Sequence, residues 1–102
     1  MLSFVIPAHD EAPVIGRALE AVRAAAAEAG EPDEVIVADD SSTDGTAAVA
    51  QGAGARVVRT ERRQIAAARN AGAAVALGEV LVFVDADTLV TGAAIHGALE
   101  AI

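Results

Sequence analysis

The sequence predicts an α/β fold: a Rossmann-like parallel sheet with helices on both faces. Four short apolar runs alternate with segments whose apolar residues recur at helical spacing, so the expected order of elements is βαβαβαβα. Right-handed crossovers leave few arrangements of such strands, and we expect the strand order 3-2-1-4 of a Rossmann-like half. The 102 residues are enough for one domain and too few for two.

The first half of the chain begins with a predicted strand over residues 2–6, an apolar run that Pro7 stops. Apolar side chains at helical spacing over residues 15–26 predict the first helix, which ends at Gly30. Residues 34–38 are the second apolar run. It is expected to be a buried strand.

The second predicted helix runs from about Asp44 to Gly52. The hydroxyl side chains of residues 41–43 are candidates for its N-terminal cap. The Asp44 carboxylate suits the positive end of the helix, and no further role is expected for it.

The second half of the chain continues the alternation. Residues 56–59 predict a short strand, placed at an edge of the sheet because it carries two arginines. Residues 64–77 form an alanine-rich helix that Gly78 ends. Residues 80–84 are a β-branched apolar run, which predicts a strand buried on both faces. A last helix is expected after Thr91.

Composition excludes several classes of function. The formal net charge of -8 argues against a nucleic-acid-binding surface, which needs a basic patch. The chain has no lysine, so a lysine base or Schiff base is excluded. It has no cysteine, which removes disulfides, thiolate catalysis and cysteine zinc sites and fits a cytoplasmic location. No apolar run approaches the roughly eighteen residues of a membrane span, and the start reads as a fold rather than a signal peptide.

Acidic side chains follow the first, second and fourth predicted strands. Because the carboxyl ends of parallel strands share one edge of the sheet, we expect these carboxylates to gather there. Two unit charges at 4 Å repel by about 4 kcal/mol at an effective dielectric near 20, so a cation or a ligand is expected to offset them. The cluster comprises Asp10, Glu11, Asp39, Asp40, Asp44, Asp85 and Asp87.

Asp85 and Asp87 are one residue apart at the end of the fourth strand. Carboxylate oxygens placed in this way suit a hard divalent cation, the more so when substrate phosphates complete its shell. The alternative is a polar strand end with a helix cap at Thr88. A metal-dependent phosphohydrolase also uses this D-x-D pattern, but it needs the lysine that this chain lacks.

Four blocks together resemble family 2 glycosyltransferases, in that family's order and at about its spacing. They are residues 4–11, 35–46, 68–72 and 85–87, and they cover nearly the whole chain. The resemblance implies the GT-A fold and transfer of a sugar, with inversion, from a nucleotide diphosphate donor linked to UDP or GDP.

The resemblance also implies roles for individual residues in binding the nucleotide sugar. The backbone at Pro7 and Ala8, with Glu11, lines the nucleoside pocket, and Asp40 accepts a hydrogen bond from the base. Arg69 lies on a helix, where it either pairs with the site carboxylates or contacts the ligand.

For the metal, the resemblance places Asp85 near the ribose and the ion. Asp87 is the direct ligand of Mn²⁺ or Mg²⁺, which holds the diphosphate. A departing nucleoside diphosphate develops negative charge, and a divalent ion stabilises that charge.

Three departures from the family pattern stand out. His9 and Asp10 occupy positions where the family often has Tyr-Asn. A basic residue common in relatives before the Arg-Asn pair corresponds to Arg62, Arg63 or Gln64, and the sequence leaves these open. No residue matches the base that activates the acceptor.

We therefore expect residues 1–102 to be the donor-binding part, with the acceptor part absent and the gene continuing. In the full-length protein, peripheral contact with a membrane is an option. The alternative is a non-catalytic nucleotide-binding module that associates with itself through an open sheet edge.

Overall fold

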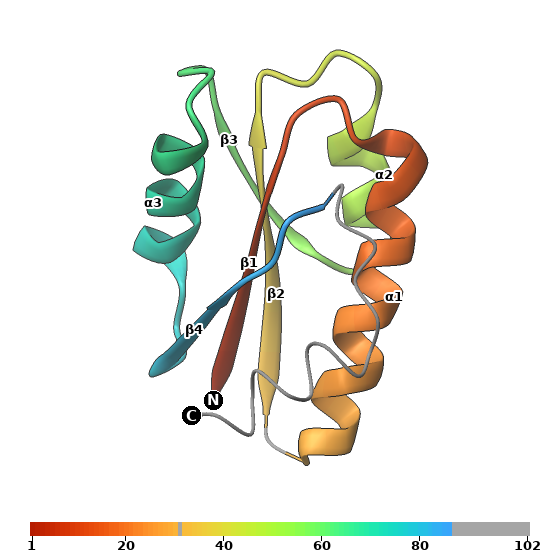
Figure 1. Ribbon diagram of the computed structural model, residues 1–102, viewed down its shortest axis with the longest axis vertical. Helices are drawn as coiled ribbons and strands as arrows, with labels where there is room; N and C mark the ends of the chain where they lie inside the picture. Colours follow the sequence, from red (N-terminus) through yellow and green to blue (C-terminus); the bar gives the residue numbers. More distant parts are fainter. Residues whose placement is uncertain (31, 87–102) are drawn as a thin grey trace.

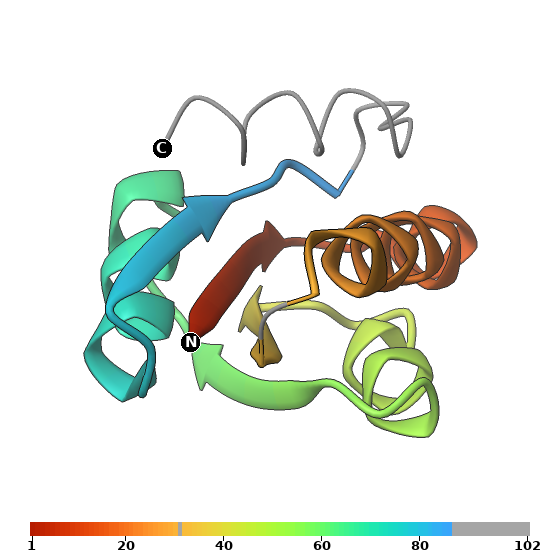
Figure 2. The ribbon, with the colours of Figure 1, turned by 90° about the horizontal axis from the view of Figure 1, so that it is seen from below.

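A four-stranded parallel sheet lies between helices in the computed structural model, which describes residues 1–30 and 32–86 (Figure 1). The strand order is β3-β2-β1-β4, so the predicted order and fold class are confirmed. Figure 2 shows α3 on one face of the sheet and α1 and α2 on the other. The predicted last helix lies outside the described residues. Within these, no helix is long and apolar enough to cross a membrane.

The central strand is β1 (Leu2–Ala8), in which every residue is buried. It pairs with β2 (Asp33–Asp40) along its whole length and with β4 (Val80–Phe83) only as far as Val5. The expectation that Pro7 stops the strand is wrong. Val84 N donates to Val5 O, so the peptide groups of residues 5 and 7 face β4, and Pro7 lies beyond its last pair. The missing N–H of proline therefore costs no ladder bond.

The second strand is also longer than predicted and includes Asp39 and Asp40. Its outer neighbour is β3 (Arg56–Thr60), which pairs with β2 alone and occupies the expected edge position among the described strands. Because side chains alternate along a strand, Asp39 and Asp40 point to opposite faces of the sheet.

One face of the sheet is covered by α1 (Ala12–Ala29) and α2 (Thr46–Gly52). The apolar side of α1 packs on the sheet, and the helix ends at Gly30, whose φ of 72° lies in the left-handed region, as expected for a glycine stop. The second helix starts two residues later than predicted. Its first residue follows Gly45, which makes no side-chain cap, so the cap expected from residues 41–43 is wrong.

The other face is covered by α3 (Ile65–Val75), which packs on β1, β2 and β3. Gly72 lies directly over β1, where an added Cβ would stand 2.4 Å from the nearest side-chain carbon of Val5. Val5 itself is fully buried. The helix therefore approaches the sheet at a distance that only glycine allows.

The fourth strand alternates between a covered and an open face. Val82 belongs to the core beneath α1, whereas Leu81 and Phe83 on the other face are 40% and 45% exposed. The prediction of a strand buried on both faces is wrong. The reason is that α3 packs over the other three strands and leaves this part of the described sheet uncovered.

Polar groups tie the amino-terminal end of the sheet to the loop before β4. Glu34 accepts hydrogen bonds from Ser3 Oγ at 2.6 Å and from the backbone N–H of Leu77, and Gly78 N donates to Ser3 Oγ at 2.8 Å. Burial would raise the pKa of the Glu34 carboxyl, but these bonds and the nearby Arg56 guanidinium hold it below its usual value. Glu34 therefore stays ionised and fastens the loop to the sheet.

We expect Gly72→Ala to lower the free energy of unfolding by about 1–3 kcal/mol, because the new methyl group must displace Val5 in a packed core. Urea unfolding measures the change. Gly52→Ala is the matched control, since nothing lies within 4 Å of its added Cβ, and it should leave stability equal or slightly higher. Equal stability of both variants and the wild type would show that α3 can move off the sheet at no cost.

Candidate functional site

A pocket of about 350 Å³ opens at the carboxyl ends of the strands, beside the start of α3. It lies where the strand order reverses between β1 and β4, which is the usual ligand position in open α/β sheets. Its volume is within the range of small-molecule sites. The lining comes from four segments: residues 7–9 and Glu11, Asp40, residues 63–65 with Ala68, and Asp85 with Ala86.

Asp40 is the most heavily bonded group in the pocket wall. Its Oδ1 accepts hydrogen bonds from Ser41 Oγ and Thr60 Oγ1, each at 3.1 Å, and from Arg63 N at 3.0 Å. Its Oδ2 accepts one from Gln64 N at 2.9 Å. Burial would raise the pKa of this carboxyl, but the donors outweigh burial and hold it below its usual value. Asp40, only 5% exposed, is therefore a carboxylate at neutral pH.

The same bonds shape the loop between β3 and α3. Arg63 has a φ of 52°, an unfavourable region for a side chain of this size, and its backbone N–H is held by Asp40. Arg63 and Gln64 line the pocket, whereas Arg62 lines a separate hollow on the outer side of α3. Of the three residues that the sequence left open, the structure thus places Arg63 and Gln64, and not Arg62, in the pocket wall.

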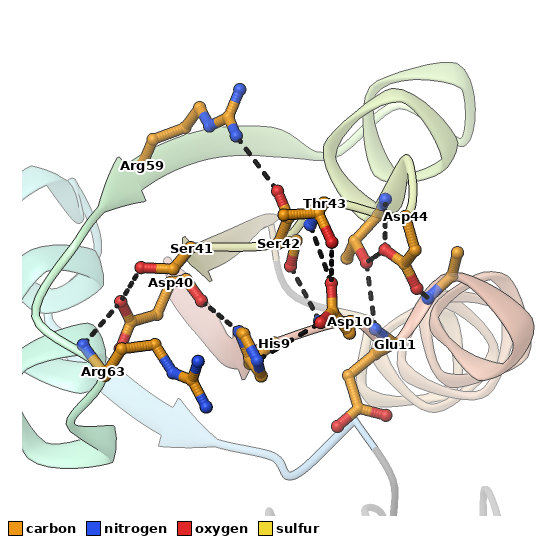
Figure 3. Close-up of polar contacts among 12 residues, drawn as sticks. His9, Asp10, Glu11, Asp40, Ser41, Ser42, Thr43, Asp44, Arg59 and Arg63 are labelled. Carbon is orange, nitrogen blue, oxygen red and sulfur yellow. Dashed lines mark hydrogen bonds and ion pairs between the residues drawn. The ribbon is translucent and has the colours of Figure 1, made fainter.

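His9 forms another part of the wall, with both ring nitrogens facing acceptors (Figure 3). Its Nδ1 lies 2.6 Å from the carbonyl oxygen of Asp40, and its Nε2 lies 3.3 Å from Asp10 Oδ2. A carbonyl oxygen only accepts, so Nδ1 donates. The Nδ1 bond therefore ties the loop after β1 to the end of β2.

Asp10 joins these loops by its backbone and its side chain. Asp10 N donates to Ser42 Oγ at 2.9 Å, and Asp10 Oδ1 accepts from Thr43 N at 2.7 Å. The residue has a φ of 50°, which aspartate tolerates better than most side chains. Its carboxylate bonds to groups of the chain itself, and Asp10 is not among the pocket-lining residues.

Asp44 also links the segments after β1 and β2, but it lies in the loop after β2 and bonds to the start of α1. Its Oδ2 accepts from Ala12 N at the start of α1, and its Oδ1 accepts from Thr46 N and Thr46 Oγ1. Thr46 Oγ1 in turn accepts from Glu11 N at 2.9 Å. The Thr46 hydroxyl first, and then the backbone donors, lower the pKa of the Asp44 carboxyl. The expectation that Asp44 is only a helix-end charge is wrong, because it holds two helix starts together.

The expected gathering of seven carboxylates therefore separates into groups with different roles. Asp39 is fully buried on the face opposite Asp40, where its Oδ2 lies 3.6 Å from Arg59 Nε. Asp10 and Asp44 fasten loops. Glu11, Asp40 and Asp85 remain in the pocket wall, and Figure 3 shows the Glu11 side chain turned away from the loop contacts. Asp87 lies outside the described residues.

Arg69 steadies Asp85 and is not among the pocket-lining residues. Its Nη2 lies 3.4 Å from Asp85 Oδ1, and its guanidinium carbon is 6.0 Å from the centre of the Phe83 ring. The pairing with a site carboxylate, which was one of two expectations for Arg69, is what the structure shows.

The donor groups fit a divalent ion that also binds phosphate. Among residues 1–30 and 32–86, no group of three or more acidic or histidine side chains could enclose a metal. Asp85 offers an oxygen at the pocket rim, with its side chain 47% exposed. One or two carboxylates completed by water and phosphate oxygens are a common arrangement for Mg²⁺. The described residues therefore fit an open metal site, in which a bound ligand would supply some of the oxygens around the ion.

Comparison with known proteins gives a family match. The sequence model of glycosyl transferase family 2 matches residues 3–102. Glucosyl-3-phosphoglycerate synthase of Mycolicibacterium paratuberculosis is 36% identical over 104 residues, a stretch covering 86% of this chain and 29% of that protein. The chain thus spans less than a third of this relative.

Solved structures agree with the observed fold. A mannosyltransferase of Pyrobaculum calidifontis, in complex with GDP-Man and Mn²⁺, has a TM-score of 0.80 and 30% identity over 97% of this chain and 31% of its own. Glucosyl-3-phosphoglycerate synthase of Mycobacterium tuberculosis, in complex with Mn²⁺, UDP and glucosyl-3-phosphoglycerate, has a TM-score of 0.64 and 30% identity over 85% of this chain and 33% of its own.

Asp40→Asn should destabilise the chain at neutral pH by about 1–3 kcal/mol, because the amide nitrogen cannot accept the bonds that the carboxylate accepts. The lowered pKa gives stability that is present above the ordinary value of 3.8 and is lost as the pH falls through the folded-state pKa. The difference between variant and wild type should therefore shrink below that pH in urea unfolding series. Asp33→Asn, at the exposed start of β2, is the matched control. Equal stability of Asp40→Asn and wild type at pH 7 would contradict the role given to this carboxylate.

Proposed function

Because the chain belongs to glycosyl transferase family 2, we propose that its pocket binds the nucleoside diphosphate of a sugar donor. The observation that carries this proposal is the convergence of four separate segments on one pocket at the reversal of strand order. Two neighbours with this fold are complexes with UDP or GDP-Man, each with Mn²⁺. We also propose that the protein is cytoplasmic, as the sequence predicts.

The pocket walls suit the parts of a nucleotide in order. Pro7 and Ala8 at the end of β1 line the pocket together with Glu11, and in this proposal their apolar and backbone groups contact the nucleoside. Asp40 offers an ionised acceptor for a base N–H. Asp85 belongs to another segment of the wall, next to Ala86, and in this proposal it takes the ribose and the diphosphate side of the nucleotide.

Asp85, with Asp87 two residues on, would hold Mn²⁺ or Mg²⁺ in this proposal. Such an ion neutralises the charge that a departing nucleoside diphosphate develops. The Arg69 guanidinium fixes one Asp85 oxygen and leaves the other for the ion. The protein of which residues 1–102 form the donor-binding part would transfer the sugar with inversion, using a base from its acceptor-binding part.

A nucleoside diphosphate with Mn²⁺ should raise the melting temperature of the chain by several degrees, because a ligand at a hundred times its Kd adds about 2.7 kcal/mol. Thermal melts are recorded in UDP or GDP, with Mn²⁺ or with a chelator. Asp85→Asn should lose most of the metal-dependent part of the shift, and Asp33→Asn should keep it. Superimposed melts with and without nucleotide would remove the proposed function for this chain.

A second proposal is self-association through the open edge at β4, which Leu81 and Phe83 favour. Both side chains are exposed on one face of a strand that pairs on one side only among the described residues. Unpaired N–H and C=O groups beside an apolar face are a surface on which another strand can add. Such a module would bind nucleotide without catalysing transfer.

Sedimentation velocity across a wide range of protein concentration measures this association. We expect dimers or larger species in the wild type and a clear reduction in Leu81→Ser, because the substitution removes apolar area at the edge. Val49→Ser is the matched control, since Val49 is equally exposed at 40% but lies on α2. A wild type that stays monomeric at the highest concentration would contradict the proposal.

A further inference from the structure

The two oxygens of the Asp40 carboxylate are used unequally. Oδ1 accepts hydrogen bonds from Ser41 Oγ, Thr60 Oγ1 and Arg63 N, whereas Oδ2 accepts one hydrogen bond, from Gln64 N. An ionised carboxylate offers about four acceptor positions, two on each oxygen. Oδ1 is therefore fully occupied by the chain itself, and the one remaining acceptor position is on Oδ2.

A single remaining acceptor position distinguishes the nucleobases. Uracil presents one N–H, between two carbonyl oxygens, and guanine presents its ring N–H and its amino group side by side. The adjacent donors of guanine need two neighbouring acceptors, such as both oxygens of one carboxylate. Adenine and cytosine place an unprotonated ring nitrogen at the corresponding position, and that nitrogen would face the carboxylate as a second acceptor.

We propose that this pocket selects uridine diphosphate over guanosine diphosphate, because the chain's own donors leave Asp40 able to receive one base N–H but not two. The inference rests on the proposed function of the pocket. It narrows the expected donor to nucleotides with one base. Similarity alone does not make this choice, because the solved structures similar to this chain include one complex with UDP and another with GDP-Man.

The surroundings of Asp40 also match the uracil carbonyls. Figure 3 shows the Arg63 side chain extending past Asp40 towards His9, and in the described part of the chain its guanidinium makes no hydrogen bond or ion pair. It can donate to one carbonyl oxygen. The Gln64 side-chain amide, in the same wall, can donate to the other. Two donor side chains, Arg63 and Gln64, thus share the pocket wall with one acceptor, Asp40, and uracil presents two acceptors and one donor.

Isothermal titration calorimetry with UDP and with GDP, at one Mn²⁺ concentration, tests the selectivity. One unsatisfied hydrogen bond to a charged group corresponds to roughly tenfold to a hundredfold in affinity, so GDP should bind at least about tenfold more weakly. Equal or tighter binding of GDP would overturn the selectivity and leave the proposed function standing. Binding of neither nucleotide would remove the proposed function, and the selectivity with it.

The double variant Ser41→Ala/Thr60→Val tests the cause, because it strips two donors from Oδ1 and leaves Arg63 N. The affinity ratio of UDP to GDP should fall severalfold, whereas general damage to the pocket would weaken both nucleotides alike. Thr43→Val, which removes a hydroxyl bonded to Asp10 rather than Asp40, should keep the wild-type ratio. If the double variant does not fold by circular dichroism, Thr60→Val alone is used. An unchanged ratio in a folded variant would contradict the proposed cause.

Discussion

The buried charge of Asp40 is the constraint on which the pocket depends. A carboxylate that is removed from water must be compensated, and here the compensation comes from the neighbouring Ser41 hydroxyl and from hydroxyl and backbone N–H groups of residues 60–64. Meeting that requirement draws the loop before α3 onto the end of β2. The same bonds set the backbone of Arg63 in an unfavourable conformation and place the start of α3 at the pocket wall.

The two loops on the other side of the pocket are held by a reciprocal pair of aspartates. Asp10, after β1, accepts from the loop after β2, and Asp44, after β2, accepts from the first turn of α1. Each carboxylate satisfies backbone donors that a loop or a helix start would otherwise leave exposed to water. Acidic residues clustered at one sheet edge can thus be fasteners, and their number alone does not measure a metal site.

The open face of β4 has a related physical cause. Gly72 lets α3 lie so close to β1 that the helix covers the other three strands. Leu81 and Phe83 remain outside that cover, and Arg69 reaches over the Phe83 ring to Asp85. The close packing of one helix therefore decides both what is exposed at the sheet edge and how the carboxylate at the pocket rim is steadied.

The sequence by itself predicted the order of the described elements and the family, because apolar periodicity, glycine stops and short motifs are local properties of the chain. The strand order followed from that element order and the rule of right-handed crossovers. The sequence also indicated Pro7, Ala8, Glu11, Asp40 and Asp85, all of which line the pocket. It placed Asp39 in the same carboxylate cluster as Asp40, because their positions on opposite faces of the sheet depend on β2 continuing for two residues beyond its apolar run. It could not choose Arg63 over Arg62, or show that Asp44 spans two loops. Only tertiary structure decided these, since side-chain direction and hydrogen-bond partners depend on segments that are distant in sequence.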